Sequence, residues 1–161
     1  MKVFCFLVGT LFLGLVLFPS LSGAQHAHGV ETKNEPMKMK MDAREVLVEG
    51  MKITFTVMDT DEHKKMLQDM KMKEDIEPGT THNITVTLKD ENNQKEITDA
   101  SLSMKVIDPN GKEQIKSLKY EDMMKSYDAY FNLTEKGKYQ VLVLVKKQDM
   151  KRTAGIYYEI K

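Results

Sequence analysis

Methionine and histidine are the residues of this sequence whose types and spacing suggest chemistry. The chain of 161 residues contains 13 methionines and 4 histidines, and the methionine count is about three times that of ordinary protein composition. Thioethers are neutral, soft donors that select Cu(I), and imidazole also binds copper. The sequence therefore points to soft-metal chemistry, with these side chains as candidate ligands.

The first candidate group is the alternating run formed by Met37, Met39 and Met41, with lysines between them. It belongs to a polar segment, residues 25–44, that shows no apolar periodicity and is expected to be a flexible arm. An arm with this spacing can wrap a Cu(I) ion. The alternative is an amphipathic strand that docks its methionines on the folded domain and exposes its lysines.

The largest candidate group lies between two predicted strands, in residues 58–82. His63, Met66 and Met70 have helical spacing and would share one helix face. Because the two flanking strands return this span to one end of the fold, we expect an ordered Cu(I) site there, with the Met37–Met41 run as a mobile auxiliary arm. The expected ligands of the ordered site are His63, Met66, Met70, Met72 and His82. The alternative is that Met66 and Met70 are ordinary core residues that cap the end of the fold.

Two smaller groups are weaker candidates. His26 and His28 would lie close to the amino terminus after signal cleavage, where an amine and an imidazole can bind Cu(II). Met123 and Met124 are adjacent in a predicted loop, which strand direction places at the end of the fold opposite His82. Either pair could equally be an ordinary terminal or loop feature.

Residues 1–24 predict export. Lys2 precedes an uncharged apolar run over residues 3–18, and Ser22-Gly23-Ala24 has the small residues of a signal-peptidase site. We expect cleavage after Ala24 and a periplasmic or otherwise exported protein with no stable membrane span; an uncleaved anchor is the alternative. Cys5, the single cysteine, lies within this segment. The mature chain would therefore lack disulfides, thiolate sites and iron–sulfur clusters, so a soft metal would need thioether and imidazole ligands.

The elements that must position these ligands are predicted to be strands. Apolar and polar residues alternate with a period of two in residues 51–58, 84–88, 102–106, 127–133, 139–145 and 156–160, and more weakly in 115–120. Turn sequences rich in Gly, Pro, Asn and Asp separate these runs. The pattern predicts an all-β protein: an immunoglobulin-like antiparallel β-sandwich of about seven strands over residues 45–161. A short helix or loop, residues 61–75, is expected after the first strand.

Two sets of motifs carry a family resemblance. The stretch Leu133-Thr-Glu-Lys-Gly-Lys-Tyr139 resembles the tyrosine corner of immunoglobulin-like sandwiches, in which the tyrosine bonds back to the preceding loop. The wider pattern resembles YtkA-like exported domains, and it consists of Pro78-Gly-Thr-Thr-His82-Asn-Ile-Thr-Val, Ile97-Thr-Asp-Ala-Ser-Leu-Ser-Met104 and Tyr127-Asp-Ala-Tyr-Phe-Asn-Leu133. The resemblance implies a bacterial envelope β-sandwich that is often linked to copper handling.

Other functional classes find little support in the sequence. No nucleophile elbow, glycine-rich phosphate loop or H-E-x-x-H motif is present, so we expect no enzyme activity. A formal net charge of zero gives no general attraction to nucleic acid. The sequence therefore predicts an exported, non-enzymatic, copper-binding or metallochaperone-like domain. The alternative is an envelope structural or protein-interaction module whose methionines only fill space.

Overall fold

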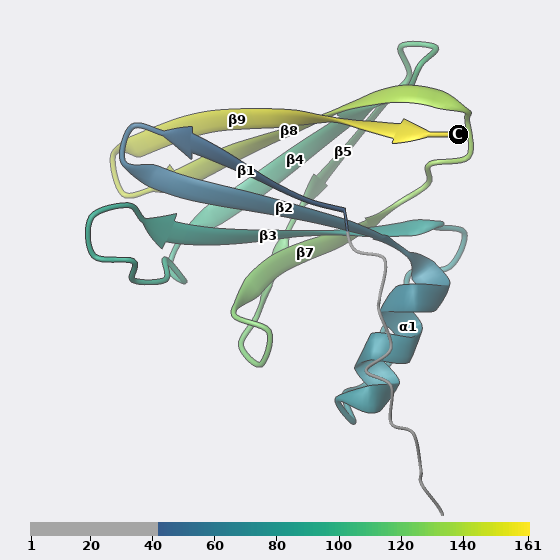
Figure 1. Ribbon diagram of the computed structural model, residues 1–161, viewed down its shortest axis with the longest axis horizontal. Helices are drawn as coiled ribbons and strands as arrows, with labels where there is room; N and C mark the ends of the chain where they lie inside the picture. The colour runs from purple at the N-terminus through teal and green to yellow at the C-terminus, as the bar shows by residue number, and fades with distance from the viewer. Residues whose placement is uncertain (1–41) are drawn as a thin grey trace, which may run out of the picture. The chain divides into compact units, whose positions relative to one another are not determined.

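The computed structural model describes residues 42–161, which form two antiparallel sheets packed face to face (Figure 1). The first sheet has the strand order β1 (Asp42–Val48), β2 (Met51–Asp59), β3 (His82–Asp90), β7 (Ser126–Phe131) and β6 (Lys119–Glu121). The second sheet has the order β5 (Glu113–Ser117), β4 (Ser101–Ile107), β8 (Gly137–Lys147) and β9 (Met150–Ile160). This architecture confirms the predicted antiparallel β-sandwich.

The described part of the chain contains nine strands rather than about seven. One addition is β1, which pairs with β2 along its whole length and begins three residues before the predicted domain boundary at residue 45. The other arises because the weak 115–120 run divides at Leu118, which is 8% exposed. On one side of Leu118, β5 pairs with β4, and on the other, β6 pairs with β7. The chain changes sheets there, which a period-two pattern alone does not reveal.

The signal peptide predicted over residues 1–24 lies outside the described residues. So do the arm as far as residue 41 and its candidate ligands His26, His28, Met37, Met39 and Met41.

The core lies between the two sheets and follows the alternation of the sequence. Phe55, Ile84, Met104 and Val143 are fully buried representatives from both sheets. Their neighbours in sequence point to the outer faces and, apart from the buried Asn83, are more exposed, as expected for strands with one buried side. The hydrophobic effect on these inner faces holds the two sheets together.

Tyr139 forms the predicted tyrosine corner at the start of β8. Its side chain is fully buried, and its hydroxyl donates to the carbonyl of Glu135 at 2.9 Å while accepting from the Glu135 amide at 2.8 Å. These two bonds satisfy a loop's backbone groups and fix the approach of the chain to β8.

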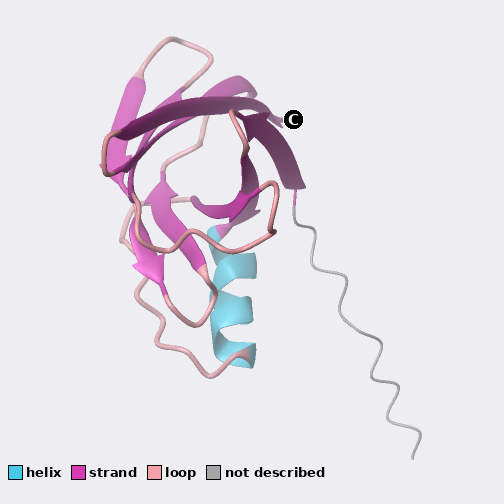
Figure 2. Ribbon diagram, turned by 90° about the vertical axis from the view of Figure 1, so that its left-hand side faces the viewer, coloured by secondary structure: helices cyan, strands magenta, loops and turns pink. Residues whose placement is uncertain are grey.

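Helix α1 (Thr60–Asp69) follows the second strand, because β1 precedes the strand that the sequence predicts as the first. Asp59 caps its amino terminus by accepting a 2.7 Å bond from the Glu62 amide. The helix ends well before residue 75, where its predicted segment ended. Figures 1 and 2 show that α1 extends away from the end of β2, outside the sandwich.

Candidate metal centre

His63 and His82, the two histidines that the sequence predicts as ligands, lie on opposite sides of the first sheet. His82 pairs with Phe131 across β3 and β7, and its ring meets that of Tyr158 edge-on at 5.9 Å between centroids. His82 therefore lies on the inner side, at the rim of the core. The next residue pair turns to the outer face, where Tyr130 contacts His63 of α1.

His63 is a buried imidazole with one satisfied nitrogen and one unpartnered nitrogen. It is 1% exposed, and its Nδ1 lies 2.8 Å from the hydroxyl oxygen of Tyr130. Its Nε2 is buried without a hydrogen-bond partner. Burial lowers the pKa of His63, because the charged imidazolium loses its hydration. The ring is therefore neutral near pH 7, and one of its nitrogens has no hydrogen-bond partner.

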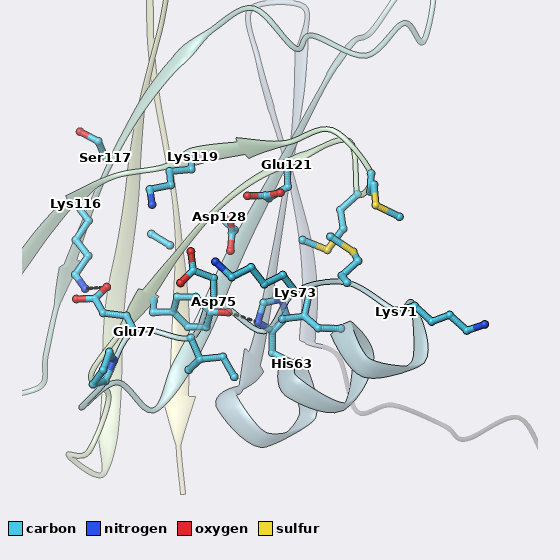
Figure 3. A pocket seen from close by; sticks show the side chains of 18 residues that line it. His63, Lys71, Lys73, Asp75, Glu77, Lys116, Ser117, Lys119, Glu121 and Asp128 are labelled. Carbon is cyan, nitrogen blue, oxygen red and sulfur yellow. Dashed lines mark hydrogen bonds and ion pairs between the residues drawn. The ribbon is translucent and has the colours of Figure 1, made fainter.

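A cavity of about 760 Å³ adjoins this imidazole on the outer side of the first sheet (Figure 3). Its wall combines α1, the segment that follows α1, the β5–β6 region, the β6–β7 turn and β7. The lining includes one imidazole, three thioethers and a phenol, which belong to His63, Met72, Met123, Met124 and Tyr130. In Figure 3 the sulfur atoms of the lining methionines gather on one side of the cavity, to the right of Asp128.

The backbone at the end of α1 places Met72 in this cavity. Lys71 has a left-handed φ of 55°, and its amide bonds to the carbonyl of Gln68 at 2.9 Å. The Met72 amide bonds to the carbonyl of Leu67 at 2.8 Å. This is a Schellman motif, which reverses the chain and brings the residue after the left-handed position back to the helix. Met72 thus lines the same cavity as Leu67 and His63.

The β6–β7 turn supplies the other two thioethers. Glu121 pairs with Ser126 at the base of the turn, and Lys125 adopts a left-handed φ of 51°. Within the turn, Met124 is half-buried and Met123 is 67% exposed. Both line the cavity, so they lie at its inner wall and at its mouth, respectively.

The cavity wall also contains polar and charged side chains. Asp128 accepts a 2.7 Å bond from the side-chain amide of Asn83, which is itself fully buried and accepts from Thr85. Burial raises the pKa of Asp128, and the bond from Asn83 partly offsets this effect. Burial and the nearby Asp128 raise the pKa of Tyr130 to about 12, so the phenol keeps its proton at neutral pH.

The structure brings together only part of the predicted ligand set. His63 and Met72 line one cavity, whereas Met66 and Met70 do not. Met66 is half-buried, and Met70 caps the end of the helix with 39% of its surface exposed. His82 lies on the opposite face of the sheet. The predicted single cluster is therefore divided, because β3 turns alternate side chains to opposite faces and the helix ends at Met70.

The sequence suggested no link between Met72 and the Met123–Met124 pair. It placed this pair at the end of the fold opposite His82, and the β3–β7 register agrees, since Val86 rather than His82 pairs with Tyr127 beside the turn. The segment after α1, however, lines the same cavity as the turn, from Lys71 to Pro78. Adjacent loop methionines were a signal, but their partner could be found only from the tertiary structure.

The candidate metal ligands of the described chain are thioethers with an imidazole, not a cluster of carboxylates or histidines. Over residues 42–161, no three or more His, Cys, Asp or Glu side chains are grouped so that they could hold a metal ion. Thioethers are additional donors, and three of them line the same cavity as one imidazole. Such a donor set is neutral and soft, which suits a monovalent ion such as Cu(I).

Fold and cavity together define a β-sandwich with a candidate soft-metal site on its outer face. No protein family profile and no curated protein sequence matches this chain. Solved structures show the same fold. FetP of uropathogenic Escherichia coli strain F11, expressed in the periplasm, has 9% identity and a TM-score of 0.55, covering 74% of this chain and 94% of its own.

Two further structures are similar to the same extent. A copper-bound variant of that FetP has 10% identity and a TM-score of 0.54, with 74% of this chain and 95% of its own covered. A DUF4426 family protein of Pseudomonas aeruginosa PAO1 has 13% identity and a TM-score of 0.53, with 73% and 94% covered. At these identities the likeness establishes the fold alone.

Within residues 42–161, no helix has the length and apolar character needed to cross a bilayer.

Proposed function

We propose that this chain is an exported, non-enzymatic protein of the YtkA-like kind that binds Cu(I) and holds it for other envelope proteins. The observation that carries this proposal is the buried, unpartnered Nε2 of His63 in the wall of a cavity that thioethers also line. An unpaired buried polar atom costs free energy, commonly about 1–3 kcal/mol. Such an atom in a native protein requires an explanation, and a bound ion is one of them.

The chemistry of the donors favours Cu(I) over divalent ions. Thioethers carry no charge and bind soft ions, so they stabilise the monovalent state of copper. The pKa of His63 is lowered by burial, which keeps its imidazole neutral and able to coordinate near pH 7. The predicted signal peptide and the absence of cysteine after it fit an exported protein that holds copper without thiolates. The copper-bound state of the FetP variant is consistent with this proposal.

The test is an anaerobic titration of the exported chain with Cu(I) in competition with a chromophoric Cu(I) chelator. Replacing Met37, Met39 and Met41 by leucine in one variant removes the contribution of the amino-terminal segment. We expect this variant to retain one tightly bound Cu(I), and the additional change His63→Phe to weaken it strongly. His82→Phe, on the other face of the sheet, is the matched control and should bind as before.

Two outcomes would contradict the proposal. Failure of the unaltered chain to compete for Cu(I) would favour the alternative function, an envelope protein-interaction module. Equal binding by the His63 and His82 variants would show that the cavity is not the site.

A further inference from the structure

We propose that Met72 and Met124 are the thioether ligands that act with Nε2 of His63, so that the metal ion bridges the segment after α1 and the β6–β7 turn. Met123, at the mouth of the same cavity, is available as a fourth donor that exchanges with solvent or with an acceptor protein. This assignment rests on the proposed function and replaces the expected set of Met66, Met70 and His82.

The first argument is the convergence of donors from separate parts of the chain. His63 comes from α1, Met72 from the segment after it, and Met124 from a turn more than 50 residues further on. All three line one cavity. Met66 lies three residues from His63 on the same helix and does not line it, so closeness in sequence is not what selects these side chains.

The second argument is that hydrogen-bonded backbone positions both thioethers without a metal. The Met72 amide is fixed by the carbonyl of Leu67 in the Schellman motif. The turn that carries Met124 is closed by the pairing of Glu121 with Ser126, and the ion pair between Lys125 and Asp122 spans it at 2.7 Å. Prepositioned ligands lose less conformational entropy on binding, which favours these side chains over methionines on an unsupported segment.

The third argument concerns charge. A Cu(I) ion on neutral ligands leaves one positive charge in a partly buried site, and an unbalanced buried charge is unfavourable. Asp128 lines the same cavity, and the amide of Asn83 bonds to one of its carboxylate oxygens at 2.7 Å. An ionised Asp128 would offset the charge of the ion without coordinating it. Asp128 is one of four acidic residues in the lining, which also contains four lysines, so the formal charges of the lining balance before the ion binds.

The assignment can be tested with two matched double variants. Met72→Leu with Met124→Leu removes both proposed donors and keeps an apolar side chain of similar size. Met66→Leu with Met70→Leu makes the same chemical change outside the cavity. Both are made in the background that lacks Met37, Met39 and Met41, and Cu(I) affinity is measured by chelator competition. Changes around a metal's ligands typically cost about 10–100-fold in affinity, so we expect at least that loss in the first variant and none in the second.

Circular dichroism of the metal-free proteins checks that each variant folds. If the first double variant does not fold, the single changes Met72→Leu and Met124→Leu replace it, and each should weaken binding more than Met66→Leu does. The assignment is wrong if the unaltered chain binds Cu(I) but the cavity variants bind it equally well, or if both double variants lose the same affinity. In these cases the proposed function stands. If the unaltered chain binds no Cu(I), the proposed function itself fails.

Discussion

The hydroxyl oxygen of Tyr130 lies 2.8 Å from Nδ1 of His63, and Nε2 of the same ring has no hydrogen-bond partner. The two residues come from β7 and α1, which are 67 positions apart in the chain. Metal-bound histidines commonly bond through their second nitrogen to a neighbouring group that fixes the ring. Nε2 can coordinate when Nδ1 carries the ring proton and donates it to the Tyr130 oxygen, because Nε2 then keeps its lone pair.

We predict that Tyr130→Phe weakens Cu(I) binding by about 10–100-fold, the usual cost of losing such a supporting contact. The free energy of unfolding should fall by about 1–3 kcal/mol, because Nδ1 of the buried His63 loses its partner. Tyr120→Phe is the matched control, because the Tyr120 hydroxyl is buried without a partner and does not line the cavity. Chelator competition and urea unfolding measure the two effects. An unchanged Cu(I) affinity in Tyr130→Phe would show that this contact is only structural.

The free energy of unfolding of the metal-free protein should decrease as the pH is lowered through the range in which histidine titrates. Burial lowers the pKa of His63 and of His82, for which Asp59 partly opposes the shift. In the unfolded chain both histidines have a pKa near about 6.5, so the unfolded state takes up protons first. The free energy of unfolding is therefore independent of these groups well above about pH 6.5 and decreases below it.

Urea unfolding of the metal-free protein between about pH 8 and about pH 5.5 measures this dependence across the histidine range. His63→Gln should reduce the slope, because the variant has one fewer proton-binding site in the unfolded state. Subtracting the variant's profile from that of the unaltered chain isolates His63 from the carboxylates. Identical slopes would mean that the pKa of His63 is the same in both states.

The left-handed residue at the end of α1 should control the position of Met72. Lys71 adopts a φ of 55°, a conformation that costs residues other than glycine about 1–2 kcal/mol. Lys71→Gly relieves this strain but makes the unfolded chain more flexible, so stability should change by less than about 1 kcal/mol, with Cu(I) affinity kept. Lys71→Val, with a branched side chain, should lower both stability and affinity. Equal affinity in the two variants would show that this reversal does not position the ligand.

Tyr139→Phe tests the fold independently of the metal site. The change removes the hydroxyl from both of its bonds to the backbone of Glu135. The Glu135 amide and carbonyl lose a partly buried partner, and we expect a loss of about 1 kcal/mol or more in the free energy of unfolding. Cu(I) affinity should not change, because Tyr139 does not line the cavity at His63. A loss of binding without a loss of stability would contradict this assignment.

The sequence predicted the sandwich because alternation and turn residues are local signals. The buried faces of β3 and β8 and the bonds of Tyr139 agree with what these signals indicated. Two errors in the strand count have local causes. The β1 strand has mostly exposed residues, and the chain changes sheets at Leu118 inside a continuous alternating run.

The candidate ligand set could be predicted only in part. The sequence analysis expected two imidazoles and three thioethers, from His63, His82, Met66, Met70 and Met72, whereas the cavity at His63 is lined by one imidazole and three thioethers. Met72 was among the expected ligands, but the chain reversal that places it occurs at Lys71 rather than at glycine, the usual residue in this conformation. Met124 could not be assigned, because its distance from His63 depends on the packing of α1 against the first sheet.

The most direct test of the central claim is a nuclear magnetic resonance titration of the unaltered chain, with its methionine methyl groups and histidine rings labelled. Ag(I) serves as a stable, diamagnetic substitute for Cu(I). We predict that one equivalent shifts the methyl signals of Met72 and Met124 and the ring signals of His63, whereas those of Met66, Met70 and His82 stay in place. Shifts at Met66, Met70 or His82 without shifts at His63 and Met72, or shifts only at Met37, Met39 and Met41, would contradict the claim that the cavity beneath α1 holds the metal.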